Sequence, residues 1–129
     1  MREKTNVYFL SEIIQRFSCD CILLENIDSN GNIKHALIDT GVAVYYDVVC
    51  KFLERHKVQK LEFLCITHTH IDHTANTVSV LEKYTVDKLI IKEFDMYWFE
   101  KGENESAQRM YERIVSKAID KNIKKLRIK

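Results

Sequence analysis

Residues 61–73 decide the fold, and they read Leu-Glu-Phe-Leu-Cys-Ile-Thr-His-Thr-His-Ile-Asp-His. The nearly continuous apolar run from Leu61 to Ile66 predicts a strand buried on both faces. Three of the five histidines of the chain follow this strand within residues 68–73, with an aspartate among them. Because the chain leaves a sheet at the carboxyl end of a strand, side chains in this segment can turn toward a common point.

The predicted metal ligands are His68, His70, Asp72 and His73. The alternate side chains His68 and His70 can converge on one cation, while Asp72 and His73 turn toward a second. Imidazole nitrogens with a carboxylate oxygen suit Zn²⁺, and also Mn²⁺ or Fe. The alternative is a chance gathering of loop or helix-cap residues, which the density of histidines in this segment disfavours. The sequence therefore predicts a metal site directly after the strand.

Strand and helix signals alternate around this segment. The polar cluster 28–32, with Asn-Gly at its centre, predicts a hairpin turn between two strands. The expected strands are 7–10, 19–27, 33–38, 61–66, 86–91 and 123–128, and the expected helices are 43–57, 74–84 and 104–120. An antiparallel start followed by alternating helices and strands predicts an α/β fold with a mixed or parallel sheet.

Length and composition limit the classes of protein to consider. The 129 residues are 46% hydrophobic and carry a formal net charge of +1, which predicts one globular domain over residues 1–129 and gives no electrostatic argument for a polyanionic partner. The first apolar stretch, Val7 to Leu10, is too short for a signal peptide or a membrane span, so no membrane partner is expected. The four cysteines follow no secreted-scaffold spacing, which favours a cytoplasmic location. Cys19 and Cys21 could bind metal as Cys-x-Cys, but a buried apolar role is favoured.

The segment Thr67–Thr74 is similar to the His-x-His-x-Asp-His signature of the metallo-β-lactamase superfamily. The resemblance implies that His68 and His70 bind a first zinc ion and that Asp72 and His73 bind a second. It also gives Asp72 a catalytic role, in which the carboxylate accepts a hydrogen bond from the metal-activated water and aims it.

A second family feature is the turn Leu37-Ile38-Asp39-Thr40-Gly41. In the family its aspartate lies close to the metal loop, which implies that Asp39 stands behind the ligands and orients one of the histidines. The alternative for Asp39 is an ordinary turn residue whose side chain bonds nearby backbone amides. The two interpretations stay open on the sequence.

The family fold is an αββα sandwich of two α/β halves, and the resemblance, strongest over residues 5 to about 92, implies the N-terminal half. Family members take a further histidine, a bridging aspartate and a final histidine from a longer chain, so the sequence is expected to be truncated and the isolated chain incomplete or inactive. Neither His35 in the hairpin nor His56 near a helix end is expected to replace them. One half alone leaves the inner sheet face exposed, and a second copy of the chain could cover it.

The implied activity is hydrolysis of an ester, amide or phosphodiester by a metal-activated water. Residues 7–10 and 19–25 are similar to the hydrolase domain of competence-related DNA-uptake proteins, which tilts the expected substrate toward phosphodiesters. Whether the substrate is a small molecule or a nucleic acid stays open. The alternative function is a non-catalytic metal-binding or oligomerisation module.

Overall fold

The sheet begins with three antiparallel strands. A computed structural model describes residues 2–13, 21–41, 46–67, 76–92 and 105–128. Strand β1 (Lys4–Phe9) ends in a single 3-10 turn (Leu10–Glu12) and pairs with β2 (Ile22–Ile27), which pairs with β3 (Ile33–Ile38). The carboxylate of Asp28 accepts hydrogen bonds from the backbone N–H groups of Asn30 and Asn32, at 2.8 and 2.9 Å, and Gly31 takes a φ of 84°. These contacts close the hairpin that the polar cluster predicts.

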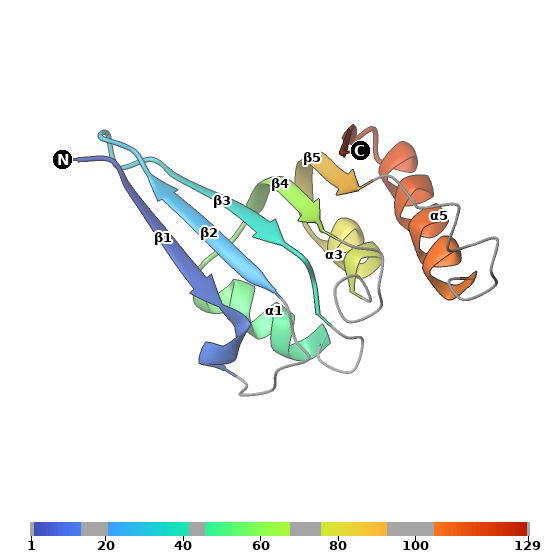
Figure 1. Ribbon diagram of the computed structural model, residues 1–129. Coiled ribbons are helices and arrows are strands. Elements are labelled where there is room, and N and C mark those ends of the chain that lie inside the picture. Colours follow the sequence, from blue (N-terminus) through green and yellow to red (C-terminus); the bar gives the residue numbers. More distant parts are fainter. Residues whose placement is uncertain (1, 14–20, 42–45, 68–75, 93–104, 129) are drawn as a thin grey trace.

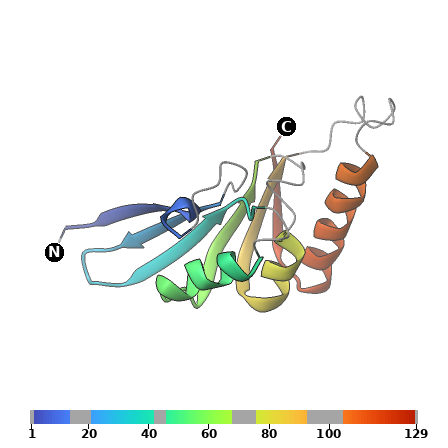
Figure 2. The ribbon, with the colours of Figure 1, turned by 90° about the horizontal axis from the view of Figure 1, so that it is seen from below.

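The second half of the sheet is parallel. Helix α1 (Tyr46–Arg55) leads to β4 (Lys60–Ile66), α3 (Thr77–Lys83) to β5 (Thr85–Lys92), and α5 (Glu105–Asp120) to β6 (Lys124–Ile128). The six strands lie in the order β1-β2-β3-β4-β5-β6. Right-handed crossovers between strands in consecutive order place every helix on the same face, and Figures 1 and 2 show all three there. The predicted α/β fold with a mixed sheet is confirmed.

The hydrophobic core lies between this face and the helices. Leu23, Leu37, Leu64 and Leu89 are register partners across four neighbouring strands and are fully buried. Burial of each such side chain contributes about 1.5–3 kcal/mol relative to exposure. The helices supply the opposing layer, with Val49, Phe52, Leu53, Val80, Leu81, Ile114 and Ala118. The core therefore holds both the antiparallel and the parallel strands against one helical layer.

The opposite face of the sheet has no helix over it among the described residues (Figure 2). Val7, Leu24, Ala36 and Phe63 form one cross-strand row on this face, and Val7 is 50% exposed. Phe9 begins a second row and is 54% exposed. The open sheet face, defined here by these five residues, agrees with the expectation of an exposed inner face.

The structure corrects one detail of the sequence interpretation. The sequence predicts that β4 is buried on both faces. Leu61, Leu64 and Ile66 are fully buried, but Phe63 and Cys65, on the face opposite Leu64, are half-buried. A continuous apolar run shows that both faces of a strand can be covered, without showing what covers them.

In the described part of the chain, no helix is both long and apolar enough to cross a bilayer.

Candidate functional site

Asp39 stands where β3 ends, beside the end of the parallel strand β4. Its backbone N–H donates to the carbonyl oxygen of Cys65 at 2.8 Å, which extends the pairing of the two strands by one residue. Asp39 takes a φ of 60°, a left-handed conformation in which aspartate is one of the more tolerated residues. This backbone turn aims the Asp39 carboxylate at the residue that follows β4.

The Asp39 carboxylate holds Thr67 through both of its oxygens. The backbone N–H of Thr67 donates to Oδ1 at 2.9 Å, and the Thr67 hydroxyl donates to Oδ2 at 2.6 Å. Asp39 is only 5% exposed, so its carboxylate is largely shielded from water. Hydrogen bonds to a charged acceptor are stronger in such a shielded position than in water. The contact fixes the last described residue before the histidine-rich segment.

Thr40, the next residue of the same turn, contacts the other end of that segment. Its carbonyl oxygen accepts a hydrogen bond from the Asn76 side-chain amide at 2.8 Å, and its hydroxyl lies 3.0 Å from the hydroxyl of Thr77. All three side chains are buried. Asn76 directly precedes α3, yet its side chain does not cap that helix and bonds Thr40 instead. The turn 39–40 therefore holds residues 67 and 76–77, which flank residues 68–75 on either side.

The predicted ligands themselves, His68, His70, Asp72 and His73, lie outside the described residues, as does the beginning of the expected helix 74–84. Asp39 is the one predicted site residue that the structure describes, and it is placed at the entry to the segment that carries the other four. Its bond to the Thr67 backbone amide is the contact expected of a turn residue, and the histidines that it would orient lie outside the described residues, so both interpretations of Asp39 stay open.

The charge at this edge suits a cation. Asp39, Thr40, Gly41, Thr67, Asn76 and Thr77 include one carboxylate and no cationic side chain. The pKa of the Cys65 thiol is raised by burial and by the nearby charge of Asp39, so this cysteine stays a neutral thiol that packs against its neighbours. Within the described ranges, no group of three or more His, Cys, Asp or Glu side chains is close enough to hold a metal ion.

His35 and His56 lie far from this edge. His35 pairs with Glu25 across the hairpin, Nε2 to Oε2 at 2.9 Å, near the amino end of β3. His56 follows α1, stacks on Tyr8 with ring centroids 3.9 Å apart, and bonds Glu12 through Nε2. The expectation that neither histidine replaces a missing metal ligand agrees with their position at the opposite end of the strands.

The sequence patterns did not predict two features of the molecule. The Thr40, Asn76 and Thr77 contacts give no pattern signal, because an asparagine before a helix is typical of an N-cap. The Glu25–His35 pair could have been found, because a hairpin centred on Asn30 places residues 25 and 35 opposite each other.

Comparison with known protein families identifies the family of this chain. Residues 14–127, which make up most of the chain, match the family model of the metallo-beta-lactamase superfamily. No curated protein matches it. The mixed sheet with its helices on one face is consistent with part of the fold of that family. With a match of this extent and a fold that agrees with it, the chain belongs to the metallo-beta-lactamase superfamily.

Proposed function

We propose that this chain is a metal-dependent hydrolase in which residues 68–73 provide the metal ligands. The superfamily membership suggests metal-dependent hydrolysis in general terms. The observation that carries the proposal is the contact of one turn with both flanks of the motif, Asp39 with Thr67 and Thr40 with Asn76. Hydrogen bonds that hold the residues next to a metal loop restrict the conformations of the ligands and raise metal affinity.

The residues divide the work as follows. His68 and His70 hold one cation, and Asp72 and His73 hold another, with Zn²⁺ as the first choice and Mn²⁺ or Fe as alternatives. When bound, the cations supply a water of lowered pKa and polarise the scissile group. Asp72 would also accept a hydrogen bond from the attacking water and orient it, as a general base does. Asp39 acts behind the ligands, through Thr67.

Two protein ligands for each cation give weak metal retention. Stable zinc sites in proteins use three or four protein ligands, so these four side chains alone should bind zinc loosely and support little turnover. The proposed substrate class is an ester, amide or phosphodiester, with phosphodiesters favoured by the resemblance of the first strands to DNA-uptake hydrolases. The proposed location is the cytoplasm.

Zinc binding and reporter hydrolysis test the function together. The metal-stripped chain is dialysed against Zn²⁺ or Mn²⁺, its bound metal is measured, and cleavage of a phosphodiester reporter is followed. Retained zinc should fall in His70→Ala and Asp72→Ala. It should be unchanged in the control His35→Ala, whose histidine lies in β3, away from the edge at Asp39. Equal metal content in all variants would contradict the assignment of the ligands, whereas robust turnover that vanishes in His70→Ala would contradict the expected low activity.

A second function is favoured by the open sheet face. Phe9 and Val7 are half-exposed on a face that no described helix covers, and contiguous exposed apolar surface usually marks an interface. We therefore also propose that two copies of the chain associate through this face. In this alternative the chain is an assembly module that has the metal loop but does not catalyse hydrolysis.

A further inference from the structure

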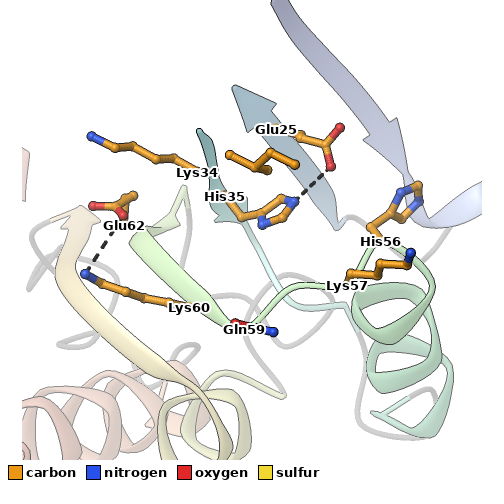
Figure 3. A pocket seen from close by; sticks show the side chains of 9 residues that line it. Glu25, Lys34, His35, His56, Lys57, Gln59, Lys60 and Glu62 are labelled. Carbon is orange, nitrogen blue, oxygen red and sulfur yellow. Dashed lines mark hydrogen bonds and ion pairs between the residues drawn. The ribbon is translucent and has the colours of Figure 1, made fainter. Parts of the chain in front are cut away.

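A cavity of about 350 Å³ lies at the end of the sheet opposite the motif. It is lined from β3 by Lys34 and His35 and from the segment between α1 and β4 by His56, Lys57 and Gln59, with Glu25, Ile33, Lys60 and Glu62 completing it (Figure 3). Most of these residues lie in or just before the amino-terminal halves of β3 and β4, and Glu25 lies on β2 opposite His35, whereas Asp39 and Thr67 follow the carboxyl ends of β3 and β4. The length of β4 separates the two regions by roughly 20 Å. The cavity is therefore distinct from the proposed metal site.

The polar side chains of the cavity wall are held in place from behind. The Glu25 carboxylate accepts hydrogen bonds from Asn6 at 3.0 Å and Tyr8 at 3.3 Å and bonds His35 at 2.9 Å. His56 is fixed by its stacking on Tyr8 and its bond to Glu12. In both imidazoles the carboxylate contact is made through Nε2, so in a neutral ring Nδ1 is an acceptor, which can take a hydrogen bond from a protonated phosphate oxygen.

The charge of the cavity favours an anion. Three lysines line it against two glutamates, so its lining is net positive even with both imidazoles neutral. Of the two carboxylates, Glu25 is engaged by His35, and Glu62 lies 3.9 Å from Lys60, which also pairs with Asp87 at 2.9 Å (Figure 3). In the described part of the chain Lys57 has no ion-pair partner. A cation in the cavity would be repelled by Lys34 and Lys57, whereas an anion would be attracted to them.

Lys57 also occupies a backbone position where a lysine is costly. Its N–H bonds Glu54 at 3.0 Å, and the N–H of Val58 bonds Leu53 at 3.0 Å, which is the pair of contacts that usually ends a helix on a glycine. Lys57 takes a φ of 57° there. Asn122 ends α5 with the same pattern and a φ of 54°, using a residue that tolerates this conformation. A lysine in such a conformation, beside a cavity, points to a use for its side chain.

We infer that this cavity binds a small phosphate-bearing anion through Lys57, Gln59 and the imidazoles of His35 and His56, with Lys34 at its rim. Lysines act as point charges toward compact oxyanions, whereas planar carboxylates are usually gripped by arginine, and no arginine lines the cavity among the described residues. The volume is that of a small-metabolite site. This inference does not rest on the proposed hydrolase function.

The test is a titration of the isotopically labelled, chelator-treated chain with inorganic phosphate at ionic strength held constant with sodium chloride. We expect saturable amide shifts at His35, Lys57 and Gln59, retained in His70→Ala. Lys57→Gln should weaken phosphate binding about tenfold, and Lys51→Gln, an exposed lysine of α1 outside the cavity, should leave it unchanged. Shifts that do not saturate, that are equal in Lys57→Gln and Lys51→Gln, or that centre on Thr67 and Asn76 would overturn the inference.

A second variant separates binding from folding. Lys57→Gly removes the side chain and also relieves the left-handed backbone, so it should melt a few degrees higher than the wild type in phosphate-free buffer. The same variant should lose most of the stabilisation that phosphate gives the wild type. A variant that melts higher and keeps the full phosphate effect would overturn the inference.

Discussion

The two carboxylate oxygens of Asp39 bind the two hydrogen-bond donors of Thr67, one from its backbone and one from its side chain. Asp39 follows β3 and Thr67 follows β4, so this contact joins the carboxyl ends of two parallel strands at the point where residues 68–73 begin. In open α/β sheets, ligand sites lie at the carboxyl ends of the strands.

Replacing Asp39 should loosen the site and the fold together. Asp39→Asn keeps an acceptor and tolerates the positive φ, but loses the charge, whereas Asp39→Ala loses both and is strained at this φ. We expect a loss of about 1–3 kcal/mol in the free energy of unfolding for Asp39→Ala and a smaller loss for Asp39→Asn, measured by urea denaturation. Zinc affinity, measured by competition with a chelator, should fall about tenfold or more in Asp39→Asn. Unchanged affinity would leave Asp39 as a turn residue only.

Thr40 and Thr77 should show energetic coupling. Their hydroxyls are 3.0 Å apart and both side chains are fully buried. Either single change to valine removes one partner of a buried hydrogen bond and should cost about 1–3 kcal/mol, while the double change should cost less than the sum of the two. Urea denaturation of the four proteins gives the coupling energy. Thr85→Val, at an exposed position, should not couple to Thr40→Val.

The Glu25–His35 pair should make stability depend on pH in the acidic range. Burial by itself would raise the pKa of Glu25, but the hydrogen bonds from His35 and Asn6 outweigh it, and the pKa is lowered. A carboxyl group with a lower pKa in the folded chain stabilises it at neutral pH, and this contribution is lost as the pH falls below about 4.3 toward the folded value. Between pH 6 and pH 3 the free energy of unfolding should therefore fall less steeply in Glu25→Gln than in the wild type.

The control for this pH dependence is Glu54→Gln. Glu54 is 64% exposed and forms a surface ion pair with Lys83 at 3.5 Å, which should contribute little. A wild-type profile that Glu54→Gln changes as much as Glu25→Gln does would contradict the assignment to the buried pair.

Association through the open sheet face should depend on Phe9. The double change Val7→Ser with Phe9→Ser removes its two most exposed apolar side chains and should shift sedimentation toward the monomer at concentrations where the wild type is dimeric. Ile119→Ser removes an apolar side chain that is 66% exposed on α5, outside this face, and should leave the mass unchanged. A wild-type chain that is monomeric at every concentration would exclude this interface.

The sequence predicted the order of elements well, because each has a strong periodic or turn signal. The hairpin around Gly31 and the helix over α5 agree with the structure, whereas several ends moved. The first strand begins at Lys4 instead of residue 7, because polar residues of an edge strand pair through their backbones and carry no apolar signal. The helix expected over 43–57 is observed as Tyr46–Arg55, with residues 42–45 outside the described part.

The candidate site was predictable only where a motif carries it. The ligand segment follows from its cluster of histidines and the role of Asp39 from the family resemblance, but the bond of Asn76 to Thr40 depends on the meeting of residues 36 positions apart. Local patterns say nothing about such contacts, which the sheet and α3 create together. The cavity beside Lys57 was missed for the same reason, because α1 and the hairpin meet only in the folded chain.

We propose that the imidazoles of residues 68, 70 and 73 hold divalent cations at the edge marked by Asp39 and Thr67. Zinc K-edge X-ray absorption of the zinc-loaded chain tests it most directly. We expect imidazole scattering with Zn–N distances of about 2.0–2.1 Å that is reduced in His70→Ala and unchanged in His56→Ala. A first coordination sphere of water oxygens alone, or the same spectrum in both variants, would contradict it.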